Sequence, residues 1–375
     1  MKLNGINTKI KIVGNPIGTS GYAIHTRNLT KAMIKEGIDI QLDLINFNSD
    51  WSKLIGDNNL RAAIEKNHPD TVPVILIMTP ENWEFYSGYP GKKYGFLVFE
   101  GSKLPFTWIK ILEKWEGDIF VPSWHVLNAL IDSLPNKNKW KNKVWIIPHG
   151  VDKEIFKPEG EKMFEKSKFV PFRFLFVGGW SQGIKDRKSL DIAIKAFLKA
   201  FPLNQNNTHS VEFIIKINKA YCPKEKVIND LADMGIIGDN RIKITDDELT
   251  EKELAKLYRS CDCFVMPSKA EAYGIPLAEA VACGIPVITS NYGGQTDYIN
   301  KTNGILVGGK MIKAESEPKF YYHNAEWLEV DVDKLANAMK KMFKKPIKIT
   351  ANKIKKINTW DKSAKYLKLI IFDKK

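Results

Sequence analysis

Short apolar runs along the chain are separated by longer stretches in which apolar positions recur every three or four residues. Runs such as "KIKIVG" (9–14), "VPVILIM" (72–78) and "VEFIIKI" (211–217) have the length of single β-strands. Between such runs, stretches such as "SLDIAIKAFLKAF" (189–201) have the period of an amphipathic helix. Strands that alternate with helices predict an α/β fold with a parallel sheet, because parallel neighbours need a long crossover connection.

This alternation occurs twice, and a polar stretch containing proline and glycine (151–171) separates the two occurrences. We therefore expect two Rossmann-like domains, at 1–155 and 156–350, that face each other across a cleft. In such sheets ligands bind beyond the carboxyl ends of the strands, so the loops after strands are where a site is expected.

The last segment, 351–375, is predicted to be one basic helix that crosses back to the N-terminal domain. Its apolar residues are spaced by three or four from about Asn352 onward, and they are Ile354, Ile357, Trp360, Ala364 and Leu367. This stripe needs an apolar partner surface.

Charge is concentrated in the same part of the chain. The net charge is +14, and residues 340–375 contribute thirteen lysines against two aspartates. Such a segment could contact an anionic membrane surface or nucleic acid, or it could simply be a solvated lysine-rich face. The pattern leaves these alternatives open.

Several features predict a cytoplasmic protein, with peripheral membrane contact as an option. The N-terminus has no secretory leader pattern, and no apolar run approaches the ~20 residues of a membrane span. Four cysteines without a C-x-x-C pair indicate reduced thiols rather than disulfides or a zinc site.

The stretch "KAEAYGIPLAEAVACGIPVITSN" (269–291) has the most suggestive chemistry. Pro276 fits only the first turn of a helix, so Glu279 lies near that helix start and Glu271 lies on the preceding loop. A helix N-terminus binds anions, and Gly274 lets a ligand approach the backbone. A diphosphate there, with hydroxyl groups held by two carboxylates, describes a nucleotide sugar. The alternative is that Glu279 only favours the helix dipole and Glu271 is solvated.

The motif "EAYGIPLAEAVACGIPVITSNYGGQTDYI" (271–299) resembles the E-x7-E signature of retaining glycosyltransferases of family GT4, which have the GT-B fold. The stretches "TSGYAIHTRNLTKAM" (19–33), "FVPSWHVLNAL" followed by "VWIIPHGVDKEIFKP" (within 120–158), and "FVGGWSQGIKDRKSLDIAIKAF" (176–197) resemble other parts of that family in the same order.

The resemblance implies roles for particular residues. Glu271 would contact the donor sugar as a catalytic residue, and Glu279 would bind the ribose. Backbone groups of Gly274, Ile275, Pro276 and Leu277, with the side chains of Lys185, Arg187 and Lys188, would hold the sugar and its diphosphate. Ser20 and Gly21 would form the loop that the diphosphate approaches in the first domain. The alternatives are a solvated loop for Lys185 and Arg187 and a tight turn for Ser20 and Gly21.

Two positions depart from the family pattern. Trp180 follows Gly179 where many members have arginine, and Glu100 stands where many members have a histidine near the sugar. Glu100 is therefore a second candidate catalytic residue, or else a structural carboxylate. His25 and His149 are expected to be structural, and Trp83 is the best tryptophan candidate for stacking on an acceptor sugar.

The resulting hypothesis is a retaining hexosyltransferase that moves a sugar from a nucleotide-sugar donor to a hydroxyl acceptor, without metal or other cofactor. Asp331 and Asp333 spell a D-x-D sequence, but they precede a helix and are better explained as its N-terminal carboxylates. The alternatives are a glycosyltransferase-like protein that binds or modifies nucleic acid through its basic segment, and a nucleotide-sugar epimerase.

Overall fold

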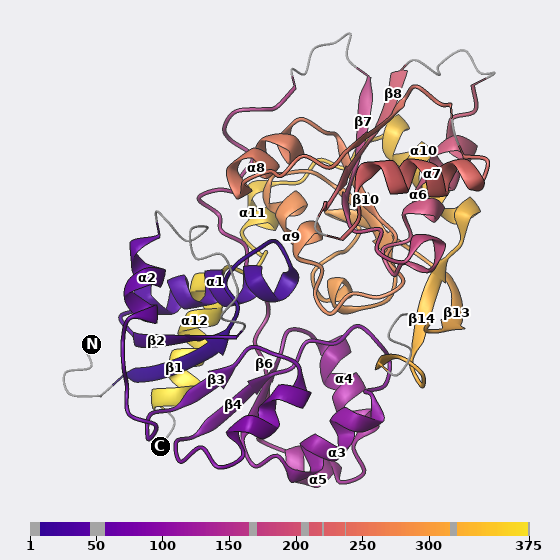
Figure 1. Cartoon of the computed structure of the whole chain (residues 1–375). Helices are drawn as coiled ribbons and strands as arrows, with labels where there is room; N and C mark the ends of the chain where they lie inside the picture. Colours follow the sequence, from indigo (N-terminus) through magenta and orange to yellow (C-terminus); the bar gives the residue numbers. More distant parts are fainter. Residues whose placement is uncertain are drawn as a thin grey trace. The chain divides into compact units, whose positions relative to one another are not determined.

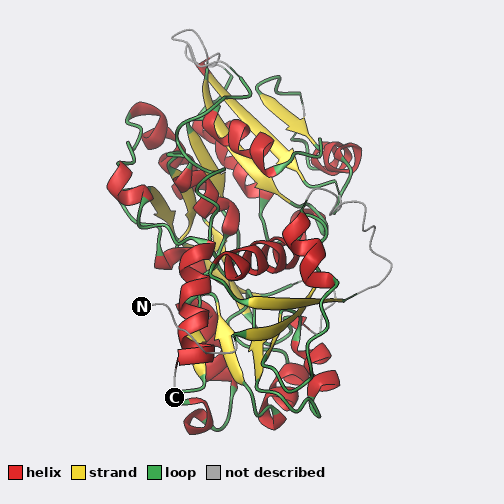
Figure 2. Ribbon diagram, turned by 90° about the vertical axis from the view of Figure 1, so that its left-hand side faces the viewer, coloured by secondary structure: helices red, strands yellow, loops and turns green. Residues whose placement is uncertain are grey.

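The structure is a computed structural model that describes residues 8–45, 57–164, 171–203, 210–219, 221–236, 238–315 and 321–373. The chain forms two compact units (Figure 1). Unit 1 comprises Met1–Phe99, Lys103–Asp152 and Asn358–Lys375, and unit 2 comprises Glu100–Ser102 and Lys153–Ile357. Each unit has its own parallel sheet with helices packed against it (Figure 2). The α/β class predicted from the sequence is therefore confirmed.

Six parallel strands form the sheet of unit 1 in the order β2-β1-β3-β4-β5-β6. One of them coincides with the predicted apolar run 9–14, and another lies within the predicted run 72–78. The strands are β1 (Lys9–Gly14), β2 (Asp39–Leu44), β3 (Val74–Leu76), β4 (Lys93–Phe96), β5 (Asp118–Val121) and β6 (Val144–Ile146).

The helices of unit 1 lie between its strands along the chain, except for the last one, which follows unit 2 in the sequence. They are α1 (Gly21–Lys35), α2 (Asn58–Ile64), α3 (Phe106–Lys114), α4 (Trp124–Ser133), α5 (Lys137–Trp140) and α12 (Trp360–Lys368). Trp83 is fully buried and donates its indole N–H to Met78 O at 3.0 Å, so its candidacy for stacking on an acceptor is wrong.

The predicted single C-terminal helix is wrong, because the chain forms two helices, α11 (Ala351–Ile354) and α12. The amide of Asn358 donates to the carbonyls of Pro148 and His149, and the Thr359 side chain caps α12. These hydrogen bonds to a distant part of the sequence, together with the Thr359 cap, lie between the two helices and separate them. The apolar stripe nevertheless packs as expected, since Trp360, Ala364 and Leu367 are buried. The yellow α12 lies beside the indigo α1 (Figure 1).

Unit 2 repeats the architecture with the sheet order β12-β11-β10-β7-β8-β9. Its parallel strands are β7 (Phe172–Gly178), β8 (Val211–Ile217), β9 (Ile242–Thr245), β10 (Cys263–Met266), β11 (Val287–Ser290) and β12 (Gly304–Val307). The accompanying helices are α6 (Leu190–Ala200), α7 (Lys224–Asp233), α8 (Glu251–Arg259), α9 (Ile275–Ala282) and α10 (Val332–Lys344). An antiparallel hairpin of β13 (Gly309–Lys313) and β14 (Glu326–Val330) was not predicted.

The topology of unit 2 brings three loops together. β10 lies between β7 and β11 in the sheet, and all three strands are parallel. Because the carboxyl ends of parallel strands meet at one edge, the loops after these strands are neighbours there. These loops contain most of the residues that the sequence singled out.

Among the described residues, no helix combines the length and apolarity needed to cross a bilayer. The four cysteines are buried thiols.

Candidate functional site

The loop between β10 and α9 is shaped by Gly274. Gly274 has φ 85° and ψ 58°, a left-handed conformation, and α9 begins at the next residue with Pro276 in its first turn. The predicted helix start is thus confirmed. The hydroxyl of Tyr298 holds the loop by donating to the carbonyls of Tyr273 at 3.0 Å and Gly274 at 2.7 Å.

The first turn of α9 offers fewer amides than the sequence suggested. Pro276 has no N–H, and the Leu277 N–H donates to Gly274 O at 3.0 Å. Within the described part of the chain, the amides of Gly274 and Ile275 have no hydrogen-bond partner. A ligand at this helix end would therefore meet these two N–H groups first.

Glu271 lies at the centre of an ion cluster and is buried, with 5% of its surface exposed. Its Oε1 accepts from Lys188 Nζ at 2.6 Å and from Arg187 Nη1 at 3.0 Å, and Arg187 Nη1 also donates to Ala270 O. Burial alone would raise the pKa of Glu271, but Lys188 and Arg187 outweigh it and lower that pKa to about 2. Glu271 is therefore a carboxylate at neutral pH.

Arg187 joins Glu271 to Glu100. Arg187 Nη2 donates to Glu100 Oε1 at 3.0 Å, so the guanidinium is shared by two carboxylates. Burial disfavours the charged guanidinium, but Glu100 and Glu271 outweigh this and raise the pKa of Arg187. Lys188 also pairs with Glu271, so the cluster consists of Glu100, Arg187, Lys188 and Glu271. The sequence had singled out each of these four residues separately.

Glu279 lies apart from this cluster in the hydrogen-bond network. It is buried on α9, and its Oε2 accepts from the Tyr258 hydroxyl of α8 at 3.2 Å. Burial, and secondly the charge of Glu251, raises the pKa of Glu279 to about 8. Burial raises the pKa of the Tyr298 hydroxyl, and the neighbouring Tyr273 and the carboxylates of Glu271, Asp297 and Glu279 raise it further.

Lys185 does not join the ion cluster. Its side chain is exposed and pairs with Glu315 Oε2 at 3.3 Å. The loop between β7 and α6 is organised instead by the buried Asp186, which accepts from Ser181 Oγ at 3.1 Å and from the Lys188 N–H at 2.8 Å. Trp180 is fully buried and donates to Asp230 at 2.8 Å, so its side chain belongs to the core of unit 2.

In unit 1, the predicted loop residues have local structural roles. Ser20 is the N-cap of α1 and accepts from the Ala23 N–H at 3.2 Å, while Gly21 is the first helical residue. Arg27 donates to the carbonyls of Pro16 at 2.9 Å and Gly18 at 3.1 Å and so fixes the loop. Contact of Ser20 and Gly21 with a donor stays a prediction.

The two histidines of unit 1 are buried among aromatic rings. The ring centroid of His25 lies 4.2 Å from that of Phe96, 4.5 Å from that of His149 and 5.6 Å from that of Trp360. Burial lowers the pKa of both histidines, that of His149 to about 3. This packing agrees with the structural role expected for them.

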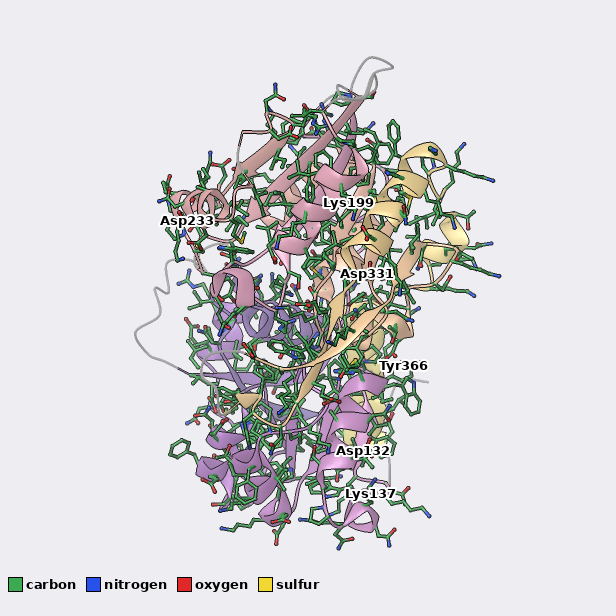
Figure 3. The ribbon with its side chains drawn as sticks, turned by 90° about the vertical axis from the view of Figure 1, so that its right-hand side faces the viewer. Asp132, Lys137, Lys199, Asp233, Asp331 and Tyr366 are labelled. Carbon is green, nitrogen blue, oxygen red and sulfur yellow. The ribbon has the colours of Figure 1, made fainter. Side chains whose placement is uncertain are left out.

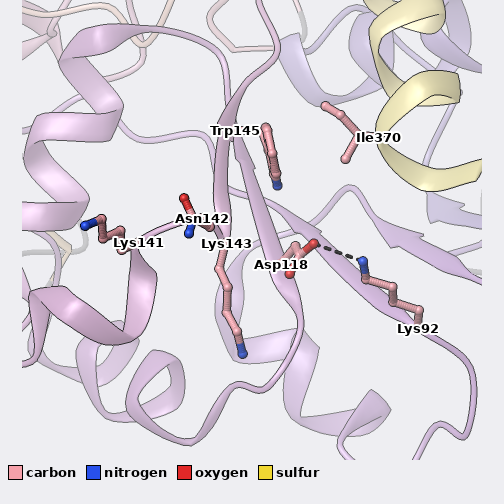
Figure 4. Close-up of a pocket in the computed structure, with 7 residues that line it drawn as sticks. All are labelled: Lys92, Asp118, Lys141, Asn142, Lys143, Trp145 and Ile370. Carbon is pink, nitrogen blue, oxygen red and sulfur yellow. Dashed lines mark ion pairs between the residues drawn. The ribbon is translucent and has the colours of Figure 1, made fainter. Parts of the chain in front are cut away.

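A hollow of about 470 Å³ in unit 1 contains none of the predicted site residues (Figure 4). It is lined by Lys92, Asp118, Lys141, Asn142, Lys143, Trp145 and Ile370, with Lys92 and Asp118 paired at 3.2 Å. Apart from Ile370, these residues precede or begin β4, β5 and β6, or lie within the three-residue β6 in the case of Trp145. They therefore lie at the amino ends of the strands, opposite the edge where α/β sheets bind ligands.

The D-x-D sequence has the helical role predicted for it. Asp331, labelled in Figure 3 with Lys199, is the N-cap of α10 and accepts from the Lys334 N–H at 2.9 Å. Asp333 pairs with Lys199. Among the described residues, no group of three or more His, Cys, Asp or Glu side chains is arranged to hold a metal ion.

The lysines of the basic segment divide between the two units. Those exposed in unit 2 lie on α10, between α10 and α11, and directly after α11, and they are Lys341, Lys344, Lys345, Lys348, Lys355 and Lys356. In unit 1, Lys368 Nζ donates to Glu36 O at 2.7 Å. Residues 374 and 375 lie outside the described chain. Contact of this segment with a membrane or nucleic acid stays a prediction.

Sequence reasoning missed three residues that hold Glu100 and Glu279 in place. Tyr258 donates to Glu279, Tyr322 donates to Glu100 Oε2 at 3.0 Å, and Trp327 Nε1 donates to Glu100 O at 3.2 Å. The alternation in "EWLEV" (326–330) was a strand signal that could have drawn attention to Trp327. No local signal pairs Tyr258 with a glutamate on another helix.

Comparisons with known proteins agree with this architecture. Residues 184–317 match the family model described as "Glycosyl transferases group 1", which confirms the resemblance to GT4-type glycosyltransferases. A D-inositol 3-phosphate glycosyltransferase of Stackebrandtia nassauensis is 29% identical over 174 residues, covering 45% of this chain and 38% of the relative. A probable sucrose-phosphate synthase of Thermosipho melanesiensis is 27% identical over 251 residues, covering 65% and 50%. The chain thus spans half or less of the length of these curated relatives.

Solved structures extend the likeness to the whole chain. A sucrose-phosphate synthase from Thermosynechococcus elongatus has a TM-score of 0.66 at 16% identity, covering 96% of this chain and 97% of its own. The Alr3699/HepE protein of Anabaena, solved in complex with UDP and glucose, has a TM-score of 0.62 at 14% identity, covering 96% and 98%. At these identities the likeness shows the fold, and it confirms the GT-B class.

Proposed function

We propose that this protein is a retaining glycosyltransferase that moves a hexose from a nucleotide-sugar donor to a hydroxyl acceptor, without a catalytic metal. The observation that carries the proposal is the cluster of Glu271, Arg187 and Lys188 at the carboxyl edge of the unit 2 sheet. The group 1 family match covers the same residues. The cluster combines fixed cations with a buried carboxylate, which suits a substrate that carries both phosphates and hydroxyl groups.

The cations serve the leaving group. When the bond between the sugar and the diphosphate breaks, negative charge grows on the phosphate oxygen. Arg187 and Lys188 are held in place by Glu271 before any substrate arrives, so little reorganisation is needed to stabilise that charge. The amides of Gly274 and Ile275 at the start of α9 add hydrogen-bond donors for the sugar or the phosphates.

The carboxylates serve the hydroxyl groups. Glu271, which stays ionised, accepts hydrogen bonds from the donor sugar. Glu279, whose pKa of about 8 keeps it largely protonated at neutral pH, both donates to and accepts from the ribose hydroxyls. The Tyr258 hydroxyl fixes the orientation of Glu279.

The proposed transfer occurs on one face of the sugar. The bond from the anomeric carbon to the phosphate oxygen breaks, and a bond from the same carbon to the acceptor oxygen forms. The acceptor proton passes to the departing phosphate, so the configuration is retained without a covalent enzyme intermediate. Glu100 contacts the donor or the acceptor beside this centre.

The donor class rests on the chemistry of the cluster and on the neighbours. Because Alr3699/HepE was solved with UDP and glucose, a nucleoside diphosphate hexose is the donor to test first. The acceptor is a hydroxyl compound, for which a glycan and a lipid are both candidates.

The test is the release of free nucleoside diphosphate from UDP-glucose, UDP-N-acetylglucosamine, GDP-mannose and ADP-glucose in the presence of candidate acceptors. The proposal expects release with one of these donors, and strong loss of that release in Glu271→Gln and Glu279→Ala. The exposed Glu225 on α7 provides the matched control, and Glu225→Gln should retain the activity. An NMR spectrum of the product reports whether the anomeric configuration is retained.

Two outcomes would favour the other hypotheses. A changed sugar in the nucleotide-linked product, formed without acceptor, would indicate an epimerase. Salt-dependent binding to duplex DNA, lost when residues 340–375 are removed, would indicate a nucleic-acid ligand.

A further inference from the structure

The unpredicted hairpin of β13 and β14, with the residues that join its two strands, contacts both loops that supply the ion cluster. The Leu328 N–H of β14 donates to Lys269 O at 3.0 Å, next to the Glu271 loop. Glu315, which follows β13, pairs with Lys185 at 3.3 Å on the loop before Arg187. Trp327 is fully buried in a small apolar cluster with Ala270, Ala314 and Ala325. The hairpin is therefore anchored to both loops that supply the cluster.

The same hairpin holds the segment Glu100–Ser102, which groups with unit 2 although its sequence neighbours belong to unit 1. The Glu326 N–H donates to Ser102 Oγ at 2.8 Å. Trp327 Nε1 donates to the Glu100 carbonyl, and the Tyr322 hydroxyl donates to Glu100 Oε2. Glu100 is thus fixed through its backbone by one aromatic residue and through its carboxylate by another.

Fixing Glu100 has an electrostatic consequence. Glu100 and Glu271 together carry two negative charges, and Arg187 and Lys188 carry two positive charges. A nucleoside diphosphate brings at least two further negative charges, so it must compete with a carboxylate for a cation. Glu100 is the weaker competitor, because 24% of its side chain is exposed against 6% for Glu271, and it pairs with one cation rather than two.

Building on the proposed function, we propose that Tyr322 and Trp327 are positioning residues that hold the Glu100 carboxylate against Arg187. We call this ion pair, held by the two aromatic residues, the latch. The donor's diphosphate displaces Glu100 from the guanidinium, and the released carboxylate turns to the substrate while the hairpin keeps its backbone in place. The latch keeps the Arg187 guanidinium where it can contact the diphosphate, but it lowers the affinity for the donor because Glu100 competes for the same cation. It thereby couples arrival of the diphosphate to placement of Glu100.

This proposal predicts opposite changes in binding and turnover. In Glu100→Gln, Arg187 has one competing charge fewer, so UDP, GDP or ADP should bind roughly threefold to tenfold more tightly by calorimetry. Turnover should nevertheless fall, because the carboxylate is missing. Tyr322→Phe removes one hydroxyl group and should show the same signs with a smaller effect, about twofold to threefold in each direction. A merely structural role would weaken binding and turnover together.

The exposed Tyr366 on α12 supplies the matched control, and Tyr366→Phe should leave both quantities unchanged. Melting temperatures of all variants show that they remain folded. Unchanged or weaker diphosphate binding in Glu100→Gln and Tyr322→Phe, with normal binding by the wild type, overturns the latch and leaves the proposed function standing. Failure of the wild type to bind UDP, GDP or ADP overturns both.

Discussion

Unit 1 and unit 2 each contain a strand, a short glycine-containing loop and a helix at the carboxyl edge of a parallel sheet, but the two loops differ in how their polar groups are satisfied. In unit 1 the side chain of Ser20 caps α1, and Arg27 is occupied by backbone carbonyls. In unit 2 the N-cap of α9 is Gly274, which has no side chain to offer. The loop before it contains Glu271, joined to two cations.

This difference shows how one supersecondary arrangement can serve either stability or binding. The unit 1 loop satisfies its helix end and its cation internally. The unit 2 loop leaves two amides without a partner among the described residues, and its Glu271 belongs to a buried cluster of two carboxylates and two cations. Buried amides without a partner and buried charges lower the stability of the folded protein, so their presence suggests that a ligand binds them.

The largest effect is expected from replacing Glu271, the charged residue that distinguishes the unit 2 loop from the unit 1 loop. Glu271→Gln keeps the size of the side chain but removes the charge that holds Arg187 and Lys188 and contacts the sugar. We expect turnover to fall by about a hundredfold or more, measured as nucleoside diphosphate release. Turnover within a few fold of the wild type would show that this carboxylate has no part in transfer.

The two loop glycines provide a matched pair of substitutions. Gly274→Ala places a side chain at φ 85°, with its Cβ 3.0 Å from Leu277 Cδ1, and should cost about 1 to 2 kcal/mol of stability. Gly21 is helical and a Cβ there meets nothing within 4 Å, so Gly21→Ala should be neutral or stabilising by about 0.5 kcal/mol. Urea denaturation measures both, and equal effects would contradict the comparison.

The two glutamates should give opposite dependences of stability on pH. The pKa of Glu271 is lowered from 4.5 to about 2, so its contribution is present above pH 4.5 and is lost as pH falls through that range. The pKa of Glu279 is raised from 4.5 to about 8, so the folded state binds its proton more tightly than the unfolded state. The contribution of Glu279 to the free energy of unfolding is therefore fully present below pH 4.5 and declines as the pH rises toward 8.

Melting temperatures of the wild type and Glu279→Gln between pH 5 and 8 check the second dependence. The decline attributable to Glu279 should vanish in the variant. A difference between the two proteins that stays constant across this range would contradict the assignment.

The smallest expected effect concerns the cap of α1. Ser20→Ala removes the acceptor for the Ala23 N–H and should cost about 1 kcal/mol of stability. Donor turnover measured on the same variant separates this capping role from the predicted role in donor binding. A loss of turnover much larger than the loss of folded protein would support the second role.

Much of the fold was readable from the sequence because the signals are local. The strands β1 and β8 coincide with their apolar runs, and Pro276 and Gly274 located the start of α9 within one residue. The C-terminal helix was predicted as one because its spacing continues across Asn358. The hydrogen bonds that divide it come from carbonyls more than 200 residues away.

The sequence by itself determined the two α/β halves, the helix that begins beside Gly274, and the identity of the charged residues around it, since periodicity and the backbone limits of proline and glycine act over a few residues. Only the tertiary structure decided which charges meet. In the folded chain Arg187 pairs with both Glu100 and Glu271, Lys185 pairs with Glu315 instead, and Tyr258 donates a hydrogen bond to Glu279. Electrostatic and hydrogen-bond energies depend on distance in space, and no spacing along the chain encodes that distance.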